Sequence, residues 1–162
     1  MIIQATKKLQ DFIGIKPEVI EKSASLEVWH GNIFMIGRRK SLLLTHNESL
    51  YSIFIYGITK KELKNFAEII KKNLGELMRR DSFTIPQIAN VLASIEKINY
   101  TKTSSKKVLG SMNDMVHMLK YYDMTEDELS LAQRINNTPY KVGGYIYPRE
   151  ALRGLLDSQG NL

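Results

Sequence analysis

The 162-residue sequence has no cysteine, so disulfides, thiolate metal sites, iron–sulfur clusters and cysteine nucleophiles are all excluded. It also lacks any apolar run of about eighteen residues, the length that a membrane-spanning helix needs. Lys7, Lys8 and Asp11 interrupt the start of the chain before the core of a signal peptide could form. These absences predict a soluble cytoplasmic protein with no membrane partner.

The signatures of common enzymes are missing as well. There is no Gly-x-Ser-x-Gly nucleophile elbow and no glycine-rich phosphate loop. The three histidines, His30, His46 and His117, have no second ligand-type residue at a familiar metal spacing. The sequence therefore predicts no metal site, no cofactor and no assignable catalytic residue, and it favours a non-enzymatic protein.

Charge is the feature that remains. Lys and Arg number 23 against 17 Asp and Glu, which gives a net charge of +6 and a pI near 9.4. The excess is uneven, because residues 101–162 carry a net charge of only +1 and residues 1–100 carry the other +5. A basic N-terminal half favours polyanionic partners, either a nucleic acid or an acidic protein.

Hydrophobic patterning predicts strands before helices, within a single domain over residues 1–162 that is strand-rich in 1–58 and helix-rich in 59–162. An apolar start at residues 1–5 runs into a short helix between a Thr6 N-cap and Gly14. Three strands are expected near 33–37, 41–45 and 50–56, with His30-Gly31-Asn32 among the turn signals that separate the β-rich runs.

Apolar residues at three- and four-residue spacing then predict helices over about 60–79, after Thr84, over 106–122, from a Thr125 capping box to Asn136, and from Pro148 to about Leu156. Residues 98–103 are expected to be extended. This order indicates an α+β fold: a small antiparallel sheet, made of the N-terminal strand plus a three-stranded meander, with about four to six helices packed mainly on one face.

Three basic clusters are candidate phosphate-binding residues. Two of them lie at a strand-to-helix junction and at a hairpin turn, and the third comes before a helix, with an aromatic residue beside it. The candidates are Lys7, Lys8, Arg38, Arg39, Lys40, Tyr100, Lys102, Lys106 and Lys107. The alternative interpretation is that turns and helix ends are charged for solubility.

A second candidate is a pocket with polar groups. Trp29, His30 and Asn32 lie at the entrance to the meander, and Asn113 and Asp114 follow Gly110 within a helical pattern. A mid-helix glycine costs about 1 kcal/mol relative to alanine, which close packing against another element would explain. The alternative is that the lone tryptophan anchors the core, with its indole N–H on a backbone acceptor.

Short motifs in order along the chain also indicate a family. They are Gln4-Ala5-Thr6-Lys7-Lys8-Leu9, Trp29-His30-Gly31-Asn32, Arg38-Arg39-Lys40, Tyr56-Gly57-Ile58, Tyr100-Thr101-Lys102-Thr103, Leu109-Gly110-Ser111-Met112-Asn113-Asp114 and residues 136–140. With these motifs the chain resembles a widespread uncharacterised bacterial family of small stand-alone proteins, known as a domain of unknown function. The resemblance covers nearly the whole chain and implies one domain, but no activity or site residue.

Three functional hypotheses follow. The first is a binding module for nucleic acid or another phosphate-bearing ligand, which uses the basic clusters with Tyr100 and Trp29 for stacking. The second is a protein-interaction component of a toxin-antitoxin, phage-defence or counter-defence system that masks an acidic partner. The third is a small metal-independent nuclease, which needs His30, Arg38, Arg39 and Tyr100 to meet in one cleft. The sequence does not set the oligomeric state.

Overall fold

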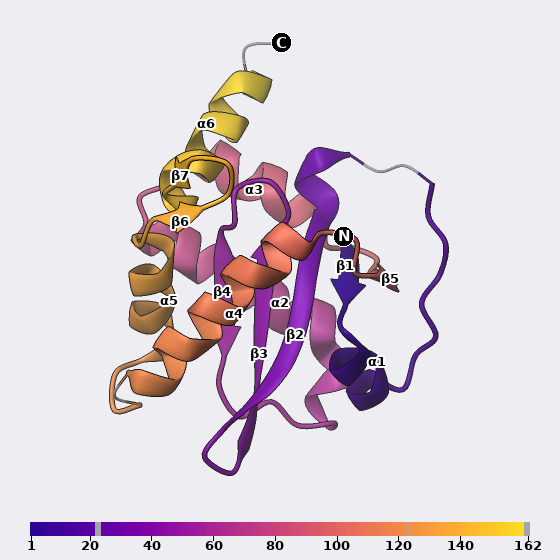
Figure 1. Cartoon of the computed structure of the whole chain (residues 1–162). Helices are drawn as coiled ribbons and strands as arrows, with labels where there is room; N and C mark the ends of the chain where they lie inside the picture. The colour runs from indigo at the N-terminus through magenta and orange to yellow at the C-terminus, as the bar shows by residue number, and fades with distance from the viewer. Residues whose placement is uncertain (22–23, 123, 161–162) are drawn as a thin grey trace.

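The structure is a computed structural model, and it describes residues 1–21, 24–122 and 124–160. Its centre is a five-stranded sheet in the order β4-β3-β2-β1-β5 (Figure 1). The strands are β1 (Ile2–Ala5), β2 (Val28–Ile36), β3 (Arg39–His46), β4 (Ser52–Ile55) and β5 (Asn99–Lys102). The predicted α+β class is confirmed, as is the meander of β2, β3 and β4.

β2 begins earlier than predicted, so His30-Gly31-Asn32 lies inside a strand and not in a turn. The reason is the packing of Gly31. A Cβ at this position would lie 2.6 Å from Leu9 Cδ2, 2.8 Å from Ile3 Cγ2 and 3.1 Å from Leu44 Cδ2. Glycine is present because neighbouring side chains approach the strand closely, and not because the chain turns at this position.

The sheet is mixed and not antiparallel throughout, which corrects the prediction. β1 pairs parallel with β2 and also parallel with β5. The helix α1 (Lys7–Ile13) follows β1, with the Thr6 side chain at its N-terminus and Gly14 at φ 77° at its C-terminus, as expected. A helical crossover returns the chain to the end of the sheet where β1 began, so the next strand runs parallel to it.

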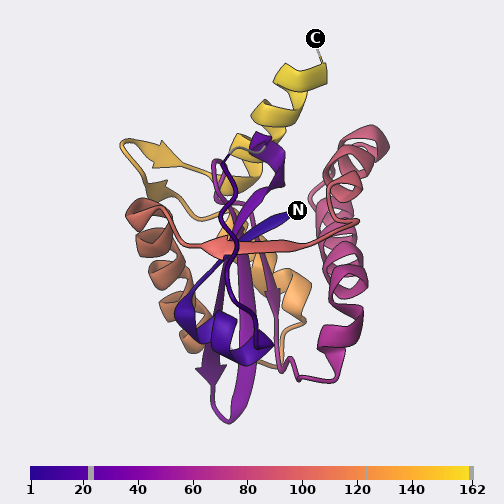
Figure 2. The same cartoon turned by 90° about the vertical axis from the view of Figure 1, so that its right-hand side faces the viewer.

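Helices cover both faces of the sheet, whereas the sequence predicted mainly one (Figure 2). Gly31 packs against α1, while the neighbouring His30 points to the other face together with its cross-strand partner Thr45. The Thr45 hydroxyl lies 3.9 Å from the sulfur of Met115 in α4 (Lys106–Tyr121), so α1 and α4 lie on opposite faces. Every residue of β3 from Ser41 to His46 is accordingly buried.

The remaining elements follow the predicted order. They are η1 (Ser25–Glu27), η2 (Glu62–Asn65), α2 (Phe66–Arg80), α3 (Ile85–Ala93), α5 (Glu128–Asn136), the hairpin strands β6 (Tyr140–Lys141) and β7 (Tyr145–Ile146), and α6 (Pro148–Gly160). The Thr84 capping box of α3 is present. The N-cap of α5 is Asp127 and not Thr125, because its carboxylate accepts from the Ser130 N–H. The hairpin was not predicted.

Helix α5 lies along the outer edge of β4. The Asn136 side chain accepts from the Ser52 N–H at 2.8 Å and donates to the Ser52 carbonyl at 2.8 Å. At the other end of the helix, burial raises the pKa of the Glu128 carboxyl, and the nearby Tyr56 backbone opposes this rise. A side chain of α5 thus bonds to backbone groups of β4 to which a further strand would otherwise bond.

One hydrophobic cluster includes buried side chains from Met1 to Leu156 and connects both layers of helices to the sheet. Its largest buried members include Trp29, Tyr51 and Phe54. Among the described residues, no helix has the length and apolar character that crossing a membrane requires.

Candidate anion-binding groove

Two adjoining cavities lie at the end of the sheet where β2 turns into β3. The larger has a volume of about 570 Å³ and the smaller about 460 Å³. Phe12, Met35 and Lys40 line both of them, so they form one continuous depression, here called the groove. Each cavity has the size of a small-molecule site, for which roughly 300–1,000 Å³ is usual.

Six cationic side chains from different segments surround the groove. They are Lys8 from α1, Arg38, Arg39 and Lys40 from the β2–β3 hairpin, Lys60 after β4, and Lys120 from the last turn of α4. None of the six forms an ion pair with another residue in the described ranges. The single acidic lining residue, Asp11, is paired with Lys7 at 2.7 Å. The groove therefore carries a concentrated positive charge that the protein leaves unneutralised.

Local structure explains why these cations meet. The hairpin turn contains Gly37 at φ 58°, and the chain leaves β4 through Gly57 at φ 76°, conformations that favour glycine. In an antiparallel meander the turn after the first strand and the exit from the third strand lie at the same end of the sheet. This geometry brings Lys60 beside Arg38, Arg39 and Lys40.

Two aromatic rings help to hold the hairpin cations in place. The Lys40 ammonium lies 5.0 Å from the centre of the Phe12 ring, and the Arg39 guanidinium lies 5.4 Å from the centre of the Tyr56 ring. Cation–π contacts of this kind fix a side chain without cancelling its charge. The two cations remain available to an anion in the groove.

The structure divides the predicted basic residues into two sets. Lys8, Arg38, Arg39 and Lys40 line the groove. Lys7 forms an ion pair with Asp11, and the segment from Tyr100 to Lys107 lies outside both cavities. Lys102, Lys106 and Lys107 are exposed there, at the end of β5 and the start of α4. Burial raises the pKa of the Tyr100 phenol to about 12, and its ring packs against the core.

The predicted polar pocket does not form. Trp29 and His30 are neighbours in β2 and therefore point to opposite faces of the sheet. Trp29 is a core anchor whose indole N–H donates to the Leu26 carbonyl at 3.3 Å, as the alternative interpretation held. Asn32 accepts a hydrogen bond from the Thr6 hydroxyl at 2.8 Å.

The other two pocket candidates are on a different surface. Asn113 and Asp114 lie on the exposed side of α4, and neither lines the groove. A Cβ at Gly110 would meet nothing within 4 Å. Close packing therefore does not explain this glycine, and nothing in the structure does.

His30 is fully buried beneath α4, and neither ring nitrogen has a hydrogen-bond partner in the described part of the chain. Burial alone lowers its pKa from 6.5 to about 4. The unfolded chain therefore binds more protons between these two pH values, and stability falls as the pH falls through this window. The loss attributable to His30 is about 2 kcal/mol on going from pH 7 to pH 5.

We expect His30→Leu to remove this loss, because leucine does not titrate and replaces a ring that makes no hydrogen bond. Urea unfolding of the wild type and of His30→Leu at pH 7 and pH 5 measures it. His46 serves as the control, because its ring is bonded to Ser49 and Ser25 and remains in both proteins. If the two proteins lose the same stability on acidification, His30 is not the titrating group.

Two groups of important residues were missed by the sequence reasoning. Lys60 and Lys120 line the groove, but the sequence indicates only that Lys60 begins a helix predicted over about 60–79. The meander topology was the signal that could have found it, since that topology places residue 60 beside the hairpin turn. No periodic signal marks Lys120.

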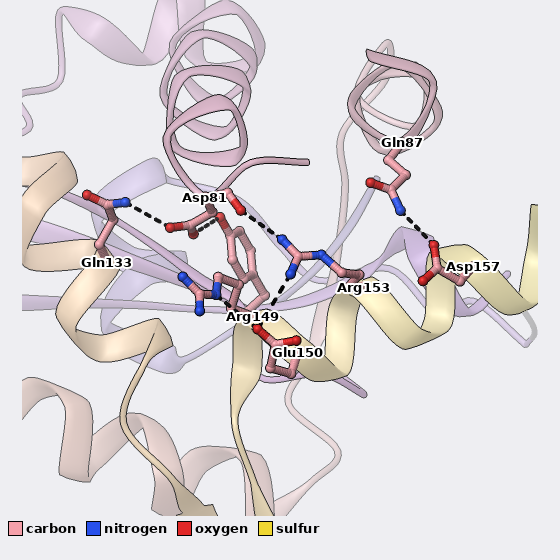
Figure 3. A network of polar contacts seen from close by, with 8 residues as sticks. Asp81, Gln87, Gln133, Arg149, Glu150, Arg153 and Asp157 are labelled. Carbon is pink, nitrogen blue, oxygen red and sulfur yellow. Dashed lines mark hydrogen bonds and ion pairs between the residues drawn. The ribbon is translucent and has the colours of Figure 1, made fainter. Parts of the chain in front are cut away.

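The second missed group is a buried polar cluster around Asp81 (Figure 3). One carboxylate oxygen accepts from the Tyr51 hydroxyl at 2.6 Å, and the other accepts from Gln133 at 2.9 Å. Arg153 of α6 donates to the Asp81 carbonyl at 2.8 Å, and its guanidinium lies 5.0 Å from the centre of the Phe83 ring. The cluster connects the C-terminal end of α2, the residue before β4, α5 and α6, and none of its side chains lines the groove.

Burial and the adjacent Asp81 carboxylate raise the pKa of Tyr51 far above its ordinary value, so the phenol stays protonated and donates. Elsewhere in the described residues, no group of three His, Asp or Glu side chains is arranged to hold a metal ion.

The fold and the groove define an α+β protein with a cationic depression at one end of a mixed sheet. The chain belongs to the family described as Domain of unknown function (DUF6933), which matches residues 2–151. This confirms the resemblance indicated by the motifs. No curated protein and no solved structure matches the chain.

Proposed function

We propose that the protein is a binding module for nucleic acid and that the groove contacts its phosphates. The observation that carries this proposal is the convergence of six unpaired cations from four segments on one concave surface. Basic residues spread for solubility would be distributed over the surface, whereas these meet where several could contact successive phosphates.

Salt dependence provides the first test. We expect labelled 20-nucleotide DNA and RNA, single-stranded and duplex, to bind in fluorescence anisotropy, with affinity that falls steeply between about 50 and 200 mM salt. Binding to phosphates releases condensed counterions, so the logarithm of the binding constant falls linearly with the logarithm of the salt concentration. Absence of salt-sensitive binding to all four nucleic acids would overturn the proposal.

Charge reversal provides the second test. The double variant Arg38→Glu/Arg39→Glu should bind at least about tenfold more weakly, and its salt slope should fall by about two, since each phosphate contact contributes about one. The matched control is Lys72→Glu/Lys97→Glu, two exposed lysines outside the groove with the same total charge change. Equal weakening in both double variants would indicate that net charge, and not the groove, is responsible.

The nuclease hypothesis receives no support from geometry. His30 is fully buried, Arg38 and Arg39 line the smaller cavity, and Tyr100 is packed at β5. Because these four side chains do not share a cleft, no group there is placed to act as acid or base on a phosphodiester held by the arginines.

A further inference from the structure

Part of the edge of β2 is not paired, and it faces the groove. The link between β1 and β2 ends where the Thr6 N–H donates to the Gly31 carbonyl at 3.0 Å. β2 continues to Ile36, but within the described residues no strand is registered against Ile33–Ile36 on the β1 side. Backbone groups alternate in direction along a strand, so those of Ile33 and Met35 point the same way as those of Gly31.

The larger cavity lies along this edge. Its lining includes three consecutive residues of β2, Ile33, Phe34 and Met35, which only a strand edge can present together because side chains alternate between faces. The Phe12 ring in the cavity wall is 7% exposed and lies beneath the Lys40 ammonium, whereas Met35 is 45% exposed. Apolar surface and free backbone N–H and C=O groups therefore lie beside the cations Lys8 and Lys40.

We propose that the groove selects single-stranded nucleic acid, with one base inserted into the larger cavity. The base packs against the exposed Met35 side chain, its polar edge bonds to the backbone of Ile33 and Met35, and the flanking phosphates contact the surrounding cations. This inference rests on the proposed function. It adds to that function a discrimination between strand states and a role for the apolar part of the groove.

The strand state follows from what can enter the cavity. The bases of a duplex are stacked and paired inside the helix, so a duplex can reach the surrounding cations with its phosphates but must flip a nucleotide to fill the cavity. A single strand can present an unstacked base without that cost. Filling the apolar cavity therefore favours the single strand.

An acidic peptide that adds a strand to the same edge is the competing occupant. Strand addition obtains its affinity from a row of backbone hydrogen bonds. Here only Ile33 and Met35 face outward, between the α1 junction at Thr6 and the turn at Gly37. An edge with two outward-facing residues is enough for one base, but it gives an added strand only a few backbone hydrogen bonds, at the short end of the usual range of strand lengths.

The first experiment uses the unmodified protein. We expect a single-stranded 12-mer to bind about tenfold more tightly than the duplex of the same length at one salt concentration, and an abasic 12-mer to bind about tenfold more weakly than the intact strand. If all three bind equally and with salt sensitivity, the proposed function stands and this inference fails. If none binds, both fail.

The second experiment alters one backbone group. Met35→Pro removes the N–H that faces the groove, while the β2–β3 ladder is preserved because that N–H does not take part in it. The matched control, Met35→Ala, keeps the N–H and loses the same side-chain contact. We expect Met35→Pro to lose about tenfold more affinity for the intact strand than Met35→Ala does, with inorganic polyphosphate bound equally by both.

Equal losses in the two Met35 variants would overturn the role of the backbone, and circular dichroism shows whether each variant is folded. If Met35→Pro does not fold, the abasic comparison decides the matter alone. A glutamate-rich octapeptide that displaces the 12-mer as effectively as an unlabelled 12-mer would assign the edge to a peptide partner and overturn the inference.

Discussion

Replacing Asp81 with alanine is expected to lower the free energy of unfolding by about 3 kcal/mol. Asp81 is 2% exposed and its carboxylate binds Tyr51 and Gln133. The substitution leaves the buried Tyr51 hydroxyl and the Gln133 amide without their acceptor, and hydrogen bonds to a charged group are worth about 1.5–3 kcal/mol each. Urea unfolding at pH 7 measures the change.

The matched control is Asp157→Ala on α6 (Figure 3). The Asp157 carboxylate accepts one bond from Gln87 at 2.8 Å, but it is exposed, so we expect a change below about 0.5 kcal/mol. Asp81→Asn should fall between the two, because it keeps one acceptor oxygen. A loss at Asp81→Ala as small as that of the control would show that the cluster does not hold the helices together.

Gly31→Ala is expected to destabilise the protein by about 3 kcal/mol through a different mechanism, overpacking. The new methyl group would lie within 3.1 Å of three side chains, from α1, β1 and β3. Two of them, Leu9 and Ile3, are almost fully buried and have no free volume into which to move. Thermal and urea unfolding should both show the loss.

Gly110→Ala is the contrasting substitution. It places the same methyl group on a helix position that meets nothing within 4 Å, and we expect a gain of about 1 kcal/mol from helix propensity. Opposite signs at the two glycines would confirm that crowding, and not glycine flexibility, governs position 31. A neutral Gly31→Ala would mean that α1 can shift away from β2.

Much of the fold was predictable because periodicity reports which residues face a core. The helix after Thr84 begins where its capping side chain indicated, the helix predicted over 106–122 begins at Lys106, and the meander follows its turn signals. The direction of β1 and β5 was not predictable, since the residue pattern of a strand of four residues does not specify whether it pairs parallel or antiparallel. Gly31 resembles a turn residue in the sequence because the side chains that crowd it come from distant parts of the chain.

The groove was predictable in part. Clusters within one turn, such as Arg38, Arg39 and Lys40, are visible because their members are adjacent in sequence. Lys8, Lys60 and Lys120 join them only through tertiary structure, which no local pattern encodes. The Asp81 cluster could not be predicted for the same reason, because its partners come from the residue before β4, from α5 and from α6.

Helix α5 affects how the strand of another copy could pair with the outer edge of β4. The Asn136 side chain bonds to both the N–H and the C=O of Ser52 in β4, so these two backbone groups are not free to pair with another β-strand. Edge-to-edge pairing, the usual hazard of an open sheet, is thereby opposed at the start of β4. Replacing Asn136 with an apolar residue would leave the Ser52 N–H and C=O without these two partners.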